Sequence, residues 1–213
     1  MYRGRQRVVA GLALGVVLVI GGCGDPEATD SAGPTGEWST AGCAVSRTPR
    51  RVTVGNATVP VTPPGLEAVM NAIDKAGREE FAESFAGLEV DEERVRAIVY
   101  RVRSAAFDDF IRKSAGDACI VVHDAAHSTK ELAIWHDRVL ADLPYWTHQG
   151  VQIVSIGARH DGTGVEIGAR DPGKARSELV ARYGPHAPLI FVESGPIRPL
   201  PAQTSRIAPP PGI

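Results

Sequence analysis

Hydrophobic and polar residues along the chain follow the same order of patterns twice. Apolar residues recur at helical spacing over residues 66–85, and strand-like runs then flank the acidic turn Asp91-Glu92-Glu93. A helical stretch over 105–114 and a buried run over 118–123 complete this first series. The order recurs about 65 residues later. Two helices are expected over 128–143 and 171–183, and three strands over 151–159, 165–169 and 189–192. We therefore predict an α+β fold of two successive αββαβ units, residues 43–124 and 125–194.

Turn and capping residues mark the ends of these elements. Gly55-Asn56 lies between two β-branched runs, which predicts a hairpin before the first helix. Counting the strand before each first helix, both units read βαββαβ, the ferredoxin-like order. We expect antiparallel sheets with the helices packed on one face. Ser104, and either Ser128 or Thr129, have the chemistry of helix N-caps, and Asp171-Pro172 begins the last helix.

The twice-used αββαβ order resembles that of BON domains, a family of exported modules thought to contact membranes or partner proteins. The stretch Val165-Glu166-Ile167-Gly168, followed by Asp171 and a helix, is similar to the pro-regions of streptogrisin-type proteases. Those pro-regions pack a sheet against their protease. Both resemblances imply an interaction module rather than an enzyme.

The chain begins with the pattern of a bacterial secretory signal. Three arginines precede an uncharged apolar run over residues 8–20, and two glycines and Cys23 follow it. A membrane-spanning anchor needs roughly 20 apolar residues, and a plain cleaved signal would leave Cys23 as an odd free thiol. Ile20-Gly21-Gly22-Cys23 resembles the lipobox of bacterial lipoproteins. This resemblance implies a diacylglycerol anchor on Cys23, removal of residues 1–22 and a place on the outer face of the cell membrane.

Two segments with little apolar content flank the predicted units. Residues 23–42 are rich in Gly, Ser, Thr and Pro and are expected to form a flexible tether, and residues 195–213 form a proline-rich tail. The formal net charge is −2, and about −5 without the three leading arginines. This charge argues against a nucleic-acid partner. The abundance of Arg, Ala, Gly and Val is typical of a high-GC bacterium, and the chain as a whole resembles an actinobacterial lipoprotein.

Cys43 and Cys119 remain after the predicted lipidation site. An even pair of cysteines in an exported protein predicts a disulfide, because oxidising compartments allow such bonds to persist. The alternative is two separate buried thiols. A metal site built on these cysteines is not expected, since no CxxC motif or Cys/His cluster accompanies them.

Histidines supply the main candidates for chemistry. His123, Asp124, His127 and His136 have the side chains that a catalytic zinc ion needs, which makes a metal-dependent hydrolase the alternative function. However, His123-x-x-x-His127 lacks the glutamate of the HExxH motif and spans the end of a strand. The simpler interpretation is that these are solvated loop histidines beside helix-capping residues.

Aromatic residues suggest a binding surface near the end of the third predicted helix. Tyr145, Trp146 and His148 cluster there, and Trp and Tyr are enriched at interfaces. Packing at the helix end is the alternative. No complete catalytic motif and no cofactor motif is present in the sequence. We therefore expect a non-catalytic binding module, anchored through Cys23, whose partner is an envelope protein, a cell-wall ligand or a lipid.

Overall fold

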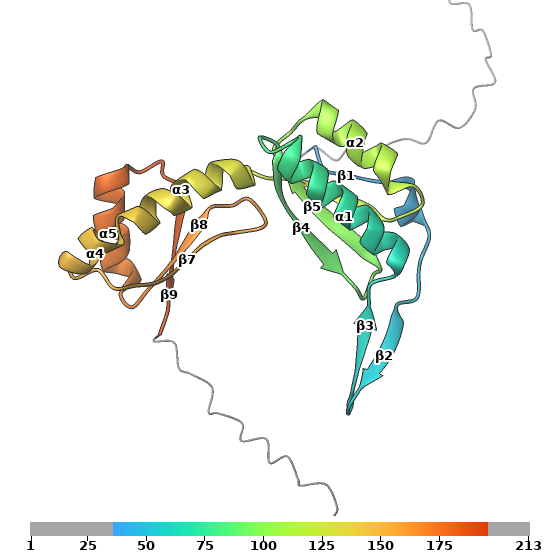
Figure 1. Ribbon diagram of the computed structural model, residues 1–213, viewed down its shortest axis with the longest axis horizontal. Coiled ribbons are helices and arrows are strands. Elements are labelled where there is room, and N and C mark those ends of the chain that lie inside the picture. The colour runs from blue at the N-terminus through green and yellow to red at the C-terminus, as the bar shows by residue number, and fades with distance from the viewer. Residues whose placement is uncertain (1–35, 196–213) are drawn as a thin grey trace, which may run out of the picture.

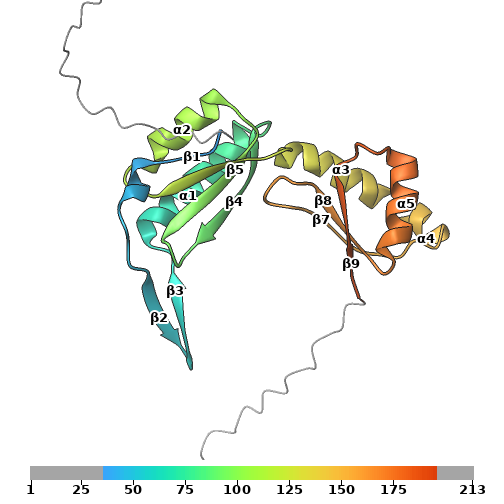
Figure 2. The same cartoon turned by 180° about the vertical axis from the view of Figure 1, so that it is seen from behind.

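The computed structural model describes residues 36–195. The predicted signal peptide, the lipidation site Cys23, most of the predicted tether and almost all of the proline-rich tail lie outside these residues. None of the helices in the described part has both the length and the apolar character needed to cross a membrane. Figures 1 and 2 show two units side by side, with the chain crossing from one to the other between β6 (Ile120–Asp124) and α3 (Thr129–Ala141).

The first unit contains two helices and a four-stranded sheet. Its elements in chain order are β1 (Trp38–Ser39), the 3-10 helix η1 (Ala41–Ala44), β2 (Arg50–Val54), β3 (Ala57–Val61), α1 (Pro64–Glu79), β4 (Phe85–Asp91), β5 (Arg96–Arg101), α2 (Ala105–Ala115) and β6. The sheet has the order β1-β6-β5-β4, while β2 and β3 form a separate two-stranded hairpin. Ile73, Val99, Phe107 and Ile111 are fully buried in the core between the helices and this sheet. Among the residues that the structure describes, no helix covers the opposite face of the sheet, which Figure 2 shows from behind.

The second unit repeats the order of helices and strands with a smaller sheet. Its elements are α3, α4 (Leu143–His148), β7 (Ile153–Ala158), β8 (Val165–Ala169), α5 (Pro172–Tyr183) and β9 (Leu189–Glu193). The three strands have the order β7-β8-β9. Leu132, Val139, Trp146, Ile167 and Leu179 are buried in a second core. Each unit therefore has its own sheet and its own hydrophobic core.

The predicted α+β class is confirmed, and most strand pairs are antiparallel. The pairs β5–β6 and β8–β9 are parallel, since a helix carries the chain back across the sheet between the two strands of each pair. In both units these two strands are direct neighbours. The strands that precede α1 and α3 therefore pair elsewhere: β3 pairs with β2, and β6 belongs to the first unit's sheet.

Two helices end earlier than their apolar patterns predict. The first was expected over residues 66–85, but α1 ends at Glu79 and the next residues turn into β4. Gly77 explains the close packing at this end, because a Cβ atom there would lie only 2.6 Å from the ring of Phe85. The helix expected over residues 128–143 is divided, since α3 ends at Ala141 and α4 starts at Leu143 with Pro144 in its first turn.

The predicted tether extends too far toward the first unit. Trp38 and Ser39 form β1 and pair with Val122 and Val121 of β6. The indole of Trp38 is buried, and the guanidinium of Arg112 lies over it at 4.2 Å from the ring centroid. Residues 36–42 therefore belong to the folded unit, and the buried indole of Trp38 is one of the contacts that hold this otherwise polar segment on the sheet.

The predicted disulfide is confirmed. Cys43 in η1 and Cys119, just before β6, are bonded with their Cα atoms 4.3 Å apart. Thr40 strengthens the same junction, since its hydroxyl donates to the carbonyl of Ala118 at 2.7 Å and accepts from the amide of Ile120 at 3.0 Å. The segment before the hairpin is thus fixed to the first unit both covalently and by hydrogen bonds.

The two units also contact each other directly. The hydroxyl of Thr129, the first residue of α3, donates to the carbonyl of Ala86 in β4 at 2.6 Å. The backbone amide of His127 donates to the carbonyl of Gly162, in the β7–β8 turn, at 3.1 Å. A Cβ atom on Gly87 would lie 2.1 Å from the carbonyl oxygen of His160, so this close approach requires glycine.

Candidate binding site in the first unit

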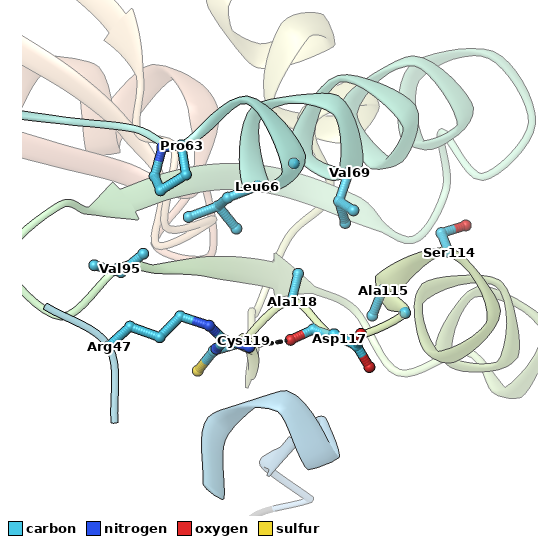
Figure 3. A pocket seen from close by; sticks show the side chains of 12 residues that line it. Arg47, Pro63, Leu66, Val69, Val95, Ser114, Ala115, Asp117, Ala118 and Cys119 are labelled. Carbon is cyan, nitrogen blue, oxygen red and sulfur yellow. Dashed lines mark hydrogen bonds between the residues drawn. The ribbon is translucent and has the colours of Figure 1, made fainter. Parts of the chain in front are cut away.

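An apolar cavity of about 420 Å³ opens between the ends of α1 and α2 in the first unit (Figure 3). Its walls are formed by the start of α1, the end of α2 and the loop that leads into β6. The lining residues with apolar side chains are Pro63, Leu66, Val69, Val95, Ala115 and Ala118, together with the disulfide-bonded Cys119. Ligand sites for small molecules are typically concave, mostly apolar and roughly 300–1,000 Å³ in volume, so this cavity has the size and surface of a small binding site.

The cavity exists because the two ends of the α1–α2 layer are filled differently. At one end, Phe81 stacks on Phe107 with the ring centroids 4.9 Å apart and lies 5.4 Å from the ring of Phe110. At the other end α2 finishes at Ala115 and is followed by Gly116. The methyl group of Ala115 is too short to reach α1, and Gly116 has no side chain. A Cβ atom added to Gly116 would meet no atom within 4 Å. Small side chains thus leave open the space that phenylalanines occupy at the other end.

Arg47 forms a charged rim beside this apolar surface. Its guanidinium donates to the carbonyl of Gly42 at 2.8 Å and also to the carbonyl of Asp117. These two carbonyls lie close to the two bonded cysteines, so Arg47 bridges the same chain segments as the disulfide. Within residues 36–195, Arg47 forms no ion pair with a carboxylate. Its guanidinium therefore makes hydrogen bonds to backbone carbonyls and no close ion pair within the described residues.

The N-terminus of α1 also lines the cavity. Pro63 occupies the N-cap position and makes no side-chain hydrogen bond to the helix. The first amide N–H groups of any helix have no acceptor within the helix, so those of Gly65 and Leu66 face outward without a capping side chain. Figure 3 shows Pro63 on the α1 side of the cavity and the guanidinium of Arg47 across from it, beside Asp117 and Cys119. The cavity lining therefore includes both a guanidinium and the positive end of a helix dipole, on different sides.

The four residues considered as metal ligands do not come together. Each histidine has its own carboxylate neighbour, the distances being 2.8 Å for His123 with Glu37, 3.0 Å for His127 with Glu131 and 2.9 Å for His136 with Asp137. Within the described part of the chain, no three His, Cys, Asp or Glu side chains are grouped so as to hold a metal ion. The geometry therefore offers no basis for the metal-dependent hydrolase considered from sequence.

Asp124 is instead held by two arginines. Its carboxylate accepts hydrogen bonds from Arg101, which is buried, and from Arg103, which is largely exposed. The hydrogen bond from Arg103, with that from Arg101, holds the pKa of Asp124 below its ordinary value despite partial burial. Arg101 also pairs with Asp108 of α2 at 2.7 Å. This network joins β5, β6 and the start of α2, and it engages the carboxylate of Asp124 in ion pairs with both arginines.

The predicted aromatic patch is only partly at the surface. Tyr145 is 41% exposed, and His148 is also exposed, but Trp146 is buried at 1%. The indole N–H of Trp146 donates to the hydroxyl of Tyr183 at 3.2 Å. Including Trp146 in a surface patch was therefore wrong, and packing at the helix end accounts for its position, because α4 turns this side chain into the second core.

Sequence reasoning missed the cavity. The only signal in the sequence is the run of small residues at the end of α2, since Ser114-Ala115-Gly116 offers no large side chain to fill the space beside α1. A second cavity of about 380 Å³ lies between the two units, lined by Asp74, Arg78, Thr129, Arg159 and His160 among others. There the arginines are paired with carboxylates, Arg78 with Asp74 at 2.9 Å and Arg159 with Asp161 at 3.1 Å, so this cavity presents no free charge of one sign.

Comparison of the chain with models of protein families, with curated proteins and with solved structures yields no match.

Proposed function

We propose that this protein is a lipoprotein of the bacterial cell envelope that acts as a non-catalytic binding module, with the apolar cavity of the first unit as its binding site. The observation that carries this proposal is the cavity itself, which combines a largely apolar lining of about 420 Å³ with a charged rim. The residues that sequence reasoning considered for catalysis lie elsewhere and each have separate structural partners.

Two observations support a place outside the cytoplasm. The first residues have the order of a lipoprotein signal, with a basic start, an apolar run and Gly21-Gly22-Cys23. The Cys43–Cys119 disulfide fits an oxidising compartment, since reducing conditions in the cytosol disfavour such bonds. A diacylated Cys23 would hold the binding module at the membrane surface more firmly than one chain can, because a single acyl chain binds a bilayer only marginally.

Binding of a neutral apolar probe tests the cavity. N-phenyl-1-naphthylamine, which fluoresces strongly in apolar surroundings, would be titrated into the protein from Gly24 to Ile213. Val69→Trp and Ser114→Trp place a large side chain on the two facing walls, so each is expected to weaken binding at least tenfold. The matched control is Val59→Trp on the β2–β3 hairpin, where the native side chain is 42% exposed and does not line the cavity.

The outcomes are clear for both parts of the proposal. Equal binding by the control and the two cavity variants, or no binding by the unchanged protein, would show that this cavity is not the binding site. Circular dichroism and an intact disulfide would establish that each variant is folded. The anchor is tested separately by mass spectrometry of the envelope fraction, where an intact Met1 or an unmodified Cys23 would contradict it.

A further inference from the structure

The ligand of this cavity can be specified further, on the basis of the proposed function. We infer that the cavity binds a single aliphatic chain that ends in a carboxylate, with the chain between α1 and α2 and the carboxylate at Arg47. This assignment rests on three features of the described residues: the apolar lining, the unpaired charge of Arg47 and the uncapped start of α1.

The shape and lining of the cavity favour one aliphatic chain. Leu66 and Val69 form one wall and Ala115 and Ala118 the facing one, as Figure 3 shows. Aliphatic side chains of this kind gain contact with methylene groups but offer no hydrogen bonds to a sugar or a peptide backbone. A volume of about 420 Å³ lies near the lower end of the range for ligand sites. A single chain therefore suits this space better than a lipid with two chains.

The rim favours an anionic head group. Arg47 carries a full positive charge and donates to two carbonyl oxygens, and a carboxylate would replace water in the remaining hydrogen-bonding positions of its guanidinium. The N–H groups at the start of α1 line the same cavity and add a favourable dipole for a negative charge. The exposed carboxylate of Asp117 also lines the mouth, so the ligand carboxylate is expected to bind on the side of the guanidinium that faces away from it.

The balance of charge favours a carboxylate over a phosphate monoester. One guanidinium balances one negative charge, and part of its hydrogen-bonding capacity is already used by the carbonyls of Gly42 and Asp117. A phosphate monoester carries between one and a half and two negative charges near neutral pH. A monoanionic head group therefore matches this rim more closely.

Calorimetric titration with three twelve-carbon probes, each kept below its aggregation concentration, tests the assignment. Dodecanoate should bind at least tenfold more tightly than dodecanol, because a hydrogen bond to a charged group contributes more than one to a neutral group. Dodecyltrimethylammonium should bind more weakly than dodecanol. Arg47→Gln should abolish the preference for dodecanoate, whereas Arg50→Gln, which removes the same charge three residues away on β2, should preserve it.

Each result decides a separate point. If dodecanol and dodecanoate bind with equal affinity and Val69→Trp blocks both, the head-group assignment fails while the proposed binding site stands. If no probe binds the unchanged protein, both proposals fail. Dodecyl phosphate binding more tightly than dodecanoate would overturn the choice of carboxylate. Retention of N-phenyl-1-naphthylamine binding by Arg47→Gln would show that the variant keeps an intact cavity. Decanoate, which is two methylene groups shorter than dodecanoate, should bind roughly fourfold more weakly for each methylene it lacks.

Discussion

The last helices of the two units, α2 and α5, end in the same way locally but differ in how the space beside their ends is filled. Helix α2 ends in Ala115 followed by Gly116, with φ of 51°, and α5 ends in Tyr183 followed by Gly184, with φ of 91°. Tyr183 lies between two tryptophans, with its ring centroid 6.2 Å from that of Trp135 and 5.7 Å from that of Trp146. Ala115 instead borders the cavity. At these two helix ends, a large aromatic side chain fills the space in the second unit, whereas a small one leaves a cavity in the first.

The units also differ in how they hold their polar groups and chain ends. In the second unit the hydroxyl of Tyr183 accepts from the indole of Trp146 and donates to Asp142 at 2.8 Å. In the first unit the indole nitrogen of Trp38 is buried without a hydrogen-bond partner among the described residues. The first unit has the disulfide, whereas the second contains no cysteine. The first unit is therefore held together in part by a covalent link, whereas the second unit depends on aromatic packing and hydrogen bonds.

The largest expected effect comes from removing the disulfide. Cys43→Ser with Cys119→Ser should lower the free energy of unfolding of the first unit by roughly 4 kcal/mol, since the bond closes a loop with a separation of 76 residues. Hydrogen exchange of amides in β5 measures this change, and amides in β8 provide the control within the same molecule. Equal loss of protection in β5 and β8 would show that the two units unfold as one, contrary to their separate cores.

Opening the second unit is expected to have the next largest effect. Tyr183→Ala creates at the end of α5 the kind of space that Ala115 leaves at the end of α2, and it should destabilise the second unit by about 3 kcal/mol. Protection of β8 amides against hydrogen exchange measures the loss. The comparison of the two helix ends would be wrong if β8 kept its protection, because Tyr183 would then contribute little to the second core.

Local signals in the sequence were sufficient to predict most helix starts. Ser104, Ser128 and Asp171 each accept a backbone hydrogen bond three residues into a helix, at 3.4, 3.1 and 2.9 Å. Capping depends on neighbouring residues alone, so a single sequence contains the necessary information. The same holds for the α+β class and the disulfide, which follow from periodicity and from the pairing of two cysteines.

Features that depend on distant residues could not be predicted in the same way. His123 and Asp124 are adjacent in the sequence, but successive residues of a strand point to opposite faces of the sheet. His123 therefore contacts Glu37 while Asp124 contacts Arg101 in the neighbouring strand, and no shared metal site results. Likewise, the sequence contains no sign that β5 and β6 pair directly, or that small residues of α2 face α1 across an empty space.

The smallest expected effect comes from the same substitution in each unit. Tyr183→Phe removes the acceptor for the buried indole N–H of Trp146, so it should destabilise the second unit by about 1–2 kcal/mol. Tyr100→Phe removes a hydroxyl that donates to Glu89 at 3.1 Å on the face of the first sheet without helices, where water can replace it. Its effect should therefore stay below about 1 kcal/mol. Denaturant unfolding followed through β5 and β8 amides compares the two variants. A larger loss of stability for Tyr100→Phe than for Tyr183→Phe would show that the more important hydrogen bond lies on the open sheet face, not in the aromatic core of the second unit.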